Sequence, residues 1–336
     1  MKLFRKITCL ILSGCIMTGC LSGCSSKKQP SAKLTKVTLN EVTHSIFYAP
    51  QYVALEKGYF KEEGIDLKID IGFGADKSMT AVISDNADIG FMGPEAAIYQ
   101  YNEGNKDYAV CFAQLTQRAG NFLVSREEIK DFKWEDLKGK DVIGGRKGGM
   151  PQMIFEYILK KKGLDPKKDL NLIQNIDFAN TSGAFSGGSG DFTVEFEPNA
   201  TALEQQGAGY VVSSLGIESG FVPYTAYCAK KSYIKKHPEI IQGFTNAIAK
   251  GQIYVKNHTP EEIADVIKDQ FPDTSKKDLI TIIKRYKDQD TYKTTPVFSK
   301  KGFYLLQDIL KDAGELKETI PFHTLIDNTY AKKAIQ

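Results

Sequence analysis

Short loops that follow strand-like runs hold the side chains best suited to bind a small molecule. One loop follows the run 37–42, and a second follows the run 89–92. Imidazole, hydroxyl and carboxyl groups there can exchange hydrogen bonds with a ligand, and aromatic rings can stack against it. The candidate binding residues of these two loops are His44, Ser45, Phe47, Tyr48, Gly93 and Glu95.

A glycine-rich loop at 144–150 offers a different kind of binding group. It follows a strand-like run and opens a predicted helix, so its free backbone N–H groups and the positive helix end favour an anionic or electron-rich ligand group. Gly148 and Met150 are the candidate contacts in this loop. The loop lacks the Gly-Lys-Ser/Thr spacing of a P-loop, which argues against a nucleotide phosphate site.

These loops need elements that hold them at one edge of a sheet. From residue 37, strand-like runs alternate with helix-length periodic stretches, a pattern typical of βαβ units and a mostly parallel sheet covered on both faces. A second alternating set begins after residue 125, and the chain past Tyr224 is almost wholly helical. In open α/β sheets, ligands bind beyond the carboxyl ends of the strands, where these loops lie. The predicted strands are 37–42, 65–71, 89–92, 108–115, 141–144, 171–176, 192–196 and 209–213.

The first 23 residues have the pattern of an export signal. Lys2, Arg5 and Lys6 precede an apolar run over 7–17, which is too short to span a bilayer. Residues 21–24 (LSGC) resemble a lipobox, the bacterial pattern whose cysteine is diacylated and becomes the mature N-terminus. We therefore expect a signal peptide over 1–23, a flexible tether over 24–36, and lipid attachment at Cys24, with Cys20 as the alternative.

The charge balance follows from this N-terminal segment. The chain has 44 basic and 41 acidic residues, a formal net charge of +3. Seven of the basic residues and none of the acidic ones precede residue 37, so the body has 37 basic and 41 acidic residues. This mildly acidic body has no basic stripe with interleaved aromatic residues, which disfavours nucleic-acid binding. The length of 336 residues favours two domains.

The body contains two of the six cysteines, Cys111 and Cys228, each in a strand-like run. Buried free thiols are the expected state, and a disulfide between the two remains the alternative. The sequence contains no CxxC, no HExxH and no His/Cys cluster. We therefore expect no zinc site and no cofactor.

Several sequence landmarks together resemble one family. Residues 44–54 (HSIFYAPQYVA) and 58–65 (GYFKEEGI) look like the opening of the solute-binding proteins of ABC importers, in the sulfonate/taurine/nitrate and thiamine-precursor (pyrimidine) group. Further landmarks follow in that family's order and extend the resemblance over about 37–312. They are 87–91 (ADIGF), 136–140 (DLKGK), 190–192 (GDF) with 196–198 (FEP), and 224–227 (YTAY).

The resemblance implies a type II periplasmic-binding-protein fold, an α/β fold with two lobes, two crossover strands and a ligand cleft that closes about a hinge. Lobe 1 would comprise 37–118 and 225–336, and lobe 2 would comprise 119–224. The implied partners are a small-molecule ligand and an ABC permease with its ATPase. We expect a monomer, lipid-anchored on the outer face of the bacterial cytoplasmic membrane.

Four more candidate binding residues lie near the predicted crossings or at a strand end: Gln117, Arg118, Glu197 and Tyr224. Arg118 could pair with a carboxylate, phosphate or sulfonate, or could instead brace the hinge. Glu197 lies where the family places its ligand, and a carboxylate there would suit an amine or a protonated ring nitrogen. His44 could contact ligand or only hydrogen-bond its loop, and one of Phe47 and Tyr48 is expected to be core.

The candidate loops favour a flat nitrogen-containing ligand. Carboxylates at Glu95 and Glu197 could accept N–H groups of a ring stacked between aromatic side chains. The aromatic candidates are Phe47, Tyr48, Phe73, Phe196, Tyr224 and Tyr227. A thiamine-related pyrimidine or another nitrogen heterocycle is therefore the expected ligand, with sulfonate, taurine or nitrate as the alternative.

An enzyme is the main rival to a binding protein. Fungal relatives of this fold make a thiamine pyrimidine with an active-site histidine and a cysteine-rich iron motif. This sequence has His44 in a comparable loop but no such cysteine cluster, and it carries an export signal. We therefore expect a protein that binds its ligand without converting it.

Overall fold

The computed structural model describes residues 33–336. The predicted signal peptide, both lipid-attachment candidates (Cys20 and Cys24) and the tether up to residue 32 lie outside the described residues. Strand β1 (Thr35–Glu41) begins inside the range predicted as tether, so residues 35 and 36 belong to the folded body. Among the described residues, no helix combines the length and the apolar composition needed to cross a bilayer.

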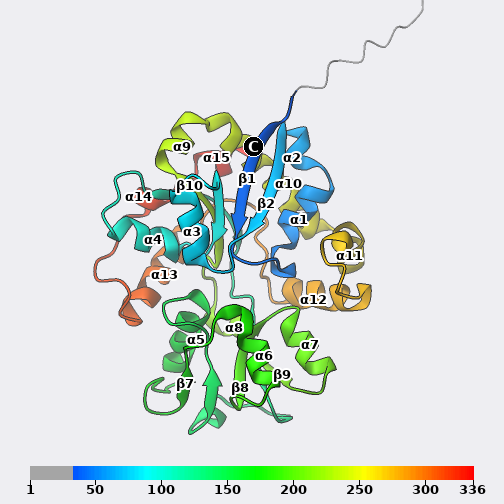
Figure 1. Ribbon diagram of the computed structural model, residues 1–336, viewed down its shortest axis with the longest axis vertical. Coiled ribbons are helices and arrows are strands. Elements are labelled where there is room, and N and C mark those ends of the chain that lie inside the picture. Colours follow the sequence, from blue (N-terminus) through cyan, green and yellow to red (C-terminus); the bar gives the residue numbers. More distant parts are fainter. Residues whose placement is uncertain (1–32) are drawn as a thin grey trace, which may run out of the picture. The chain divides into compact units, whose positions relative to one another are not determined.

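Two five-stranded sheets form the centres of two lobes (Figure 1). The strand order is β2-β1-β3-β10-β4 in the first sheet and β7-β6-β8-β5-β9 in the second. Besides β1, the first sheet contains β2 (Ile65–Ile71), β3 (Ile89–Met92), β4 (Ala109–Thr116) and β10 (Thr225–Lys230). The second contains β5 (Asn121–Ser125), β6 (Asp141–Ile143), β7 (Asn171–Ile173), β8 (Phe192–Phe196) and β9 (Tyr210–Ser214).

Each sheet mixes parallel and antiparallel pairs. β1 runs parallel to β2 and β3, whereas β10 runs antiparallel to β3 and β4. In the second sheet β6 runs parallel to β7 and β8, whereas β5 runs antiparallel to β8 and β9. The prediction of mostly parallel sheets is therefore wrong. The antiparallel pairs arise because β5 and β10 each bring the chain into a sheet from the other lobe.

Helices surround both sheets (Figure 1). The lobe of the first sheet contains η1 (Ile46–Tyr48), α1 (Ala49–Glu56), α2 (Tyr59–Glu62), α3 (Ala75–Ile83), α4 (Glu95–Asn102), α9 (Lys231–Lys236), α10 (Pro238–Asn257), α11 (Pro260–Ile267), η4 (Lys268–Gln270), α12 (Lys276–Asp288), α13 (Lys300–Asp312), α14 (Phe322–Leu325) and α15 (Thr329–Lys333). The other lobe contains η2 (Trp134–Leu137), α5 (Met150–Lys161), η3 (Phe178–Asn180), α6 (Thr181–Ser186), α7 (Asn199–Gln205) and α8 (Leu215–Ser219).

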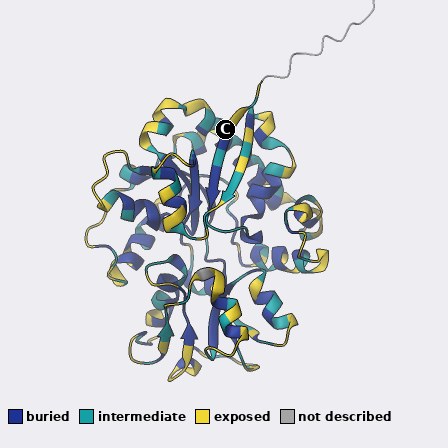
Figure 2. Cartoon of the chain, in the orientation of Figure 1, coloured by how far each residue is buried: buried dark blue, intermediate teal, exposed yellow. Residues whose placement is uncertain are grey.

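The core lies between the sheets and their helices, where buried residues are dark blue in Figure 2. Every residue of β3 and β4 is buried. β3 is a central strand covered on both faces, whereas β4 lies at the edge of the sheet, where Tyr292 and Ile326 form bridges to it. Helix α10 packs closely on α1 at Gly251, where a Cβ atom would lie 2.2 Å from the carbonyl oxygen of Pro50. Glycine at this position therefore sets the distance between the two helices.

The two body cysteines are free thiols buried in the first sheet. Cys111 of β4 and Cys228 of β10 are register partners on neighbouring antiparallel strands. Burial raises the pKa of Cys228 to about 12, so the thiol stays protonated and unreactive at neutral pH.

The chain crosses between the lobes at 117–120 and at 220–224. The strands that enter these crossings are joined by their side chains, since Thr116 Oγ1 lies 2.6 Å from Thr225 Oγ1. A third segment, after α12, borders the first crossing, where the N–H of Gln117 donates to the carbonyl oxygen of Thr291 at 2.9 Å. The lobes are therefore linked by a narrow group of hydrogen-bonded strands.

Candidate ligand-binding cleft

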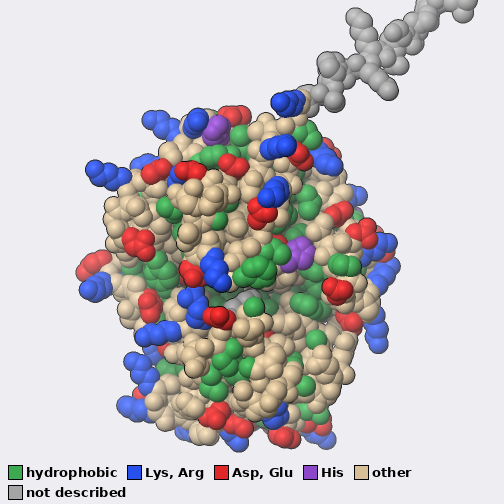
Figure 3. Space-filling model, in the orientation of Figure 1, with side chains coloured by type: hydrophobic (Ala, Val, Ile, Leu, Met, Phe, Trp, Pro, Cys, Tyr) green, Lys and Arg blue, Asp and Glu red, His purple; other side chains and the backbone are tan. Residues whose placement is uncertain are grey.

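A cavity of about 240 Å³ lies where the two lobes meet. Lobe 1 lines it with loops that follow its strands, including Thr43 after β1, Gly74 after β2 and Gly93 after β3. Lobe 2 contributes residues 149–151 at the start of α5 and the segment around 177–180. Figure 3 shows the surface hollowed between the lobes, with charged side chains near the hollow.

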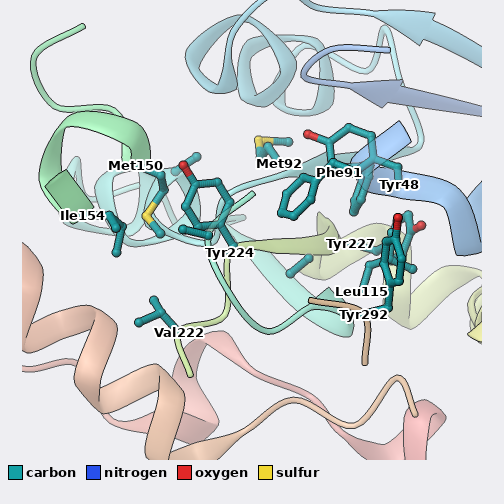
Figure 4. Packing of buried hydrophobic residues seen from close by; sticks show 14 of the residues in the cluster. Tyr48, Phe91, Met92, Leu115, Met150, Ile154, Val222, Tyr224, Tyr227 and Tyr292 are labelled. Carbon is teal, nitrogen blue, oxygen red and sulfur yellow. The ribbon is translucent and has the colours of Figure 1, made fainter. Parts of the chain in front are cut away.

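Aromatic side chains form much of the cavity wall. Tyr48 and Tyr224 line it and are almost fully buried, at 2% and 4% exposure. Phe196 lines the side contributed by lobe 2, and Phe73, which is exposed, lies at the mouth. Figure 4 shows Met150 of α5 beside the ring of Tyr224. A flat ligand would meet ring faces and a thioether here, which suits an aromatic ring.

Phe47 supports this wall from behind. Its ring is completely buried, and its centroid lies 5.4 Å from that of Tyr48 and 5.7 Å from those of Phe196 and Tyr224. A Cβ atom at Gly120 would lie 2.5 Å from the Phe47 ring, so glycine makes room for it at the crossing. Of the pair Phe47 and Tyr48, Tyr48 faces the cavity and Phe47 is core.

A buried carboxyl group with one unpaired oxygen faces the cavity. Glu95 begins α4, is 2% exposed, and its Oε2 atom has no hydrogen-bond partner among the described residues. Burial raises the pKa of Glu95 to about 8, although its own backbone N–H and Arg146 lower it. The carboxyl is therefore mainly protonated at pH 7, when it can donate one hydrogen bond and accept another.

Tyr224 and Gly93 line the cavity together with Glu95. The hydroxyl of Tyr224 is also buried and has no hydrogen-bond partner in the described part of the chain. Gly93 leaves space for the carboxyl, because a Cβ atom there would lie 2.0 Å from Oε2 of Glu95. Buried polar groups are normally paired, so these two unpaired groups in one cavity indicate where a ligand would bind.

A charged pair crosses the cleft at its rim. Arg146 of lobe 2 donates from Nη2 to Oδ1 of Asp76 in α3, at 3.2 Å. Lys77 also lines the cavity. Because Asp76 balances Arg146, the rim is not a purely cationic site of the kind that would favour a small anion.

Five of the sequence-predicted binding residues line this cavity: Tyr48, Gly93, Glu95, Met150 and Tyr224. Gly148 lies in the same loop as Met150 and lines a neighbouring cavity instead. The roles of these residues in ligand binding are predictions.

His44 and Ser45 do not line the cavity and have protein partners. The His44 ring places Nδ1 2.9 Å from Oε1 of the buried Glu41 and Nε2 2.9 Å from the carbonyl oxygen of Gln270. Ser45 Oγ donates to the carbonyl oxygen of Glu197 at 3.0 Å, across the two lobes. Both residues therefore fix the loop after β1 in place.

Three further candidates also lie away from the cavity lining. Glu197 receives a hydrogen bond from Arg285 Nη1 at 2.5 Å and another from a backbone N–H of α7. Gln117 Nε2 donates to the carbonyl oxygen of Asp290. Arg118 donates to the carbonyl oxygen of Gly216, and its guanidinium lies 4.0 Å from the centroid of the Phe221 ring. Arg118 thus braces the crossing, which was one of its two predicted roles.

Sequence reasoning missed several lining residues. Arg146 lies within the glycine-rich loop, but that loop was interpreted through its backbone and not through its arginine. Three more lie shortly after β2 or β7: Asp76 in the first turn of α3, Asp177 in the loop before η3, and Asn180 in η3. Their position after strand ends is the signal in the sequence that could have located them.

The chain matches proteins of known family. Residues 46–263 match the family model described as NMT1/THI5 like. A protein of Bacillus subtilis (strain 168) named "Putative binding protein YtlA" is 50% identical over 300 residues, which is 89% of this chain and 90% of the relative.

Solved structures with low identity share the fold. The alkanesulfonate-binding protein SsuA from Xanthomonas axonopodis pv. citri bound to MOPS has a TM-score of 0.71 at 13% identity, over 89% of this chain and all of that one. The periplasmic nitrate-binding protein NrtA from Synechocystis PCC 6803 has a TM-score of 0.73 at 16% identity, over 90% of this chain and 88% of that one. The chain therefore belongs to the NMT1/THI5-like family and has the type II periplasmic-binding-protein fold of ABC-importer solute-binding proteins.

Proposed function

We propose that this protein captures a small nitrogen heterocycle, a thiamine-related pyrimidine or a similar ring, and delivers it to an ABC importer without converting it. The observation that carries the proposal is the cavity between the lobes, whose aromatic walls surround the Glu95 carboxyl with its unpaired Oε2 atom. The family match and the fold support a solute-binding role.

The chemistry of Glu95 favours a ring that both accepts and donates. A protonated carboxyl donates through its O–H and accepts through its carbonyl oxygen, which complements a ring nitrogen beside an exocyclic amino group. Tyr48 and Tyr224 would pack against the ring faces, and the free hydroxyl of Tyr224 would bond a substituent.

An anion is the competing ligand class. Structural relatives are named for binding alkanesulfonate and nitrate. Arg146, Lys77 and the N-terminus of α5 could bind an anion, but Asp76 already pairs with Arg146 and would repel a negative ligand beside it. These contacts favour a neutral or cationic ring over an anion.

Capture would bring the lobes together on the ligand. Cross-cleft contacts such as Asp76 with Arg146 and Ser45 with the Glu197 carbonyl are formed when the lobes touch, and the linked crossing strands at Thr116 and Thr225 would act as the hinge. The closed form would then dock on a permease driven by a cytoplasmic ATPase.

Ligand class can be tested by calorimetric titration of the chain from residue 24 with Cys24→Ser. We expect binding of 4-amino-5-hydroxymethyl-2-methylpyrimidine and none of taurine or nitrate. Glu95→Ala should weaken pyrimidine binding about tenfold or more, since a buried hydrogen bond is lost. The exposed Glu135→Ala in lobe 2 serves as the control and should leave affinity unchanged. Binding of taurine or nitrate with no pyrimidine binding would refute the proposed ligand.

We also propose a lipid anchor at Cys24 on the outer face of the cytoplasmic membrane. The support is the signal-peptide and lipobox pattern of the first 24 residues and the segment 25–36, which contains lysines and no acidic residue. Metabolic labelling with radioactive palmitate in a bacterial host should mark the full-length chain and not its Cys24→Ser variant. Label that persists in Cys24→Ser and disappears in Cys20→Ser would move the anchor to Cys20.

A further inference from the structure

A second cavity lies directly beside the first. It has a volume of about 400 Å³ and is lined by α3, by α4 and by the glycine-rich loop of lobe 2. The two cavities share five lining residues: Ala75, Asp76, Glu95, Arg146 and Gly149. They are therefore adjoining chambers of one cleft, which we call the ring chamber and the side chamber.

The partition between the chambers is made of side chains. The shared pair Arg146 and Asp76 is 3.2 Å apart, and the two side chains are 46% and 59% exposed. An ion pair this exposed is weak and its side chains can move apart easily. A ligand in the ring chamber could therefore extend a substituent past this pair.

A buried amide in the side chamber lacks a partner. Gln100 of α4 lines the chamber and is 4% exposed. Its Oε1 accepts a hydrogen bond from the N–H of Ala109 at 3.0 Å, so the side chain is held in one orientation, while Nε2 has no acceptor among the described residues. A buried, oriented N–H donor of this kind requires a hydrogen-bond acceptor.

The other lining groups restrict what that acceptor can be. Met79, Ile83 and Ala96 give the chamber an apolar side. Glu103 and Asp76 add carboxylates, whereas Arg146 is the cation among the lining residues and is already paired with Asp76. A carboxylate or sulfonate would be repelled here, so an uncharged acceptor such as a hydroxyl or carbonyl oxygen fits better.

Contacts between the lobes border the side chamber. The hydroxyl of Tyr99 in α4 donates to the carbonyl oxygen of Gly148 at 3.2 Å and lies 3.4 Å from Sδ of Met153 in α5. Tyr99 and Gly148 both line the chamber. A group held there would thus touch both lobes and would add to the contacts that hold them together.

We propose that the cleft binds one ligand in two parts. The ring of the ligand occupies the ring chamber, and an uncharged polar arm, a hydroxyl or carbonyl group on a short aliphatic link, occupies the side chamber. Gln100 Nε2 donates a hydrogen bond to that arm. This inference rests on the proposed function, because it assumes a heterocyclic ring in the ring chamber. It adds a second recognition point that selects among ring compounds by their substituents.

Three matched probes test the inference by calorimetric titration. They are 4-amino-2,5-dimethylpyrimidine and its analogues with a 2-hydroxyethyl or a 2-carboxyethyl group in place of the 5-methyl group. We expect the hydroxyethyl probe to bind at least tenfold tighter than the dimethyl probe, and the carboxyethyl probe to bind more weakly than the hydroxyethyl one.

A variant that fills the side chamber gives the second readout. Thr80 lines the chamber from an exposed position on α3, so Thr80→Phe should fold normally and obstruct the arm. We expect it to reduce the hydroxyethyl advantage to under threefold while the affinity for the dimethyl probe stays within twofold of the wild type. Asn102→Phe, exposed on α4 and outside both cavity linings, is the matched control and should keep the full advantage.

A second variant tests the donor itself. Gln100→Met keeps the length of the side chain and removes the free donor, together with the acceptor for the N–H of Ala109, so it should also abolish the hydroxyethyl advantage and leave the dimethyl probe bound. Equal affinity of the dimethyl and hydroxyethyl probes for the wild type, or equal weakening of both by Thr80→Phe, overturns binding in two parts alone. Failure of every pyrimidine probe to bind overturns the proposed function and this inference with it.

Discussion

Glu95 couples the stability of the empty protein to pH. Its carboxyl is buried at the start of α4, and burial raises its pKa from the ordinary 4.5 to about 8. The folded state therefore binds this proton more tightly than the unfolded state does. Its contribution to stability is fully present below pH 4.5 and is lost as pH rises through about 8.

We predict that Glu95→Gln removes this pH dependence. The amide keeps the shape of the side chain without ionising. The free energy of unfolding of the variant should therefore exceed that of the wild type by on the order of 3–5 kcal/mol at pH 9 and by little at pH 5. Urea unfolding at the two pH values measures the difference. Equal shifts at both values would show that the Glu95 carboxyl does not titrate in this way.

His44 provides a second, independent pH dependence. Burial lowers the pKa of His44, but the hydrogen bonds to Glu41 and to the Gln270 carbonyl outweigh it and the net pKa is raised. When protonated, the ring donates from both nitrogens. This stabilisation is present below the unfolded value near 6.5 and is lost as pH rises through the folded value.

We predict that His44→Gln lowers the free energy of unfolding, measured by urea denaturation, by about 1 kcal/mol more at pH 5.5 than at pH 9. The ring is 29% exposed, which leaves its interactions only partly screened. His323→Gln is the control, because His323 forms no ion pair among the described residues. The prediction fails if both variants show the same difference between the two pH values.

Binding residues could be predicted where the local chain positions them. Tyr48, Gly93 and Glu95 follow strand ends, and a strand end directs the next loop toward the cleft. Partners distant in sequence could not be predicted, so the sequence left open whether His44 contacts ligand or its own loop, and it did not indicate that Glu197 has an arginine partner. One of the two partners of His44, Gln270, is 226 residues away, and the arginine partner of Glu197, Arg285, is 88 residues away.

At the scale of elements, the packing of α10 on α1 depends on one position. We predict that Gly251→Ala destabilises the fold by about 1–3 kcal/mol, because the added methyl would meet the Pro50 carbonyl and force the helices apart. Gly183→Ala in α6 is the matched control, since a Cβ atom there meets nothing within 4 Å and helix propensity favours alanine. Chemical denaturation distinguishes the two, and comparable losses would argue against close packing at Gly251.

The elements themselves were largely predictable, and their directions were not. Alternating runs of apolar residues located the strands, because a buried strand needs side chains that pack on both faces. However, a buried strand has the same apolar pattern whether its neighbours run parallel or antiparallel to it. The direction of β5 and β10 follows from the path of the whole chain between lobes, which no local pattern contains.

At the scale of the whole molecule, Arg285 holds the lobes together. It lies on α12 and pairs with Glu197 at the end of β8 and with Glu204 on α7. The Glu197 side chain is completely buried, so removal of its cation would leave an uncompensated charge in the interior.

We predict that Arg285→Met destabilises the protein by about 3–5 kcal/mol and that adding Glu197→Gln restores part of the loss. A double-mutant cycle in urea gives the coupling between the two side chains. If the stability losses of the two single variants simply add in the double variant, the interaction between Arg285 and Glu197 contributes nothing to stability.

The path of the chain through the two sheets has an evolutionary and a practical consequence. β4 and β10 are antiparallel neighbours, with Thr116 opposite Thr225, although 108 residues separate them along the chain. Without those residues, the two strands could be joined by a short turn into a β-hairpin. The second lobe is thus topologically an insertion within a continuous first domain. The same site offers a natural junction for grafting a reporter or a lobe from another member of the family.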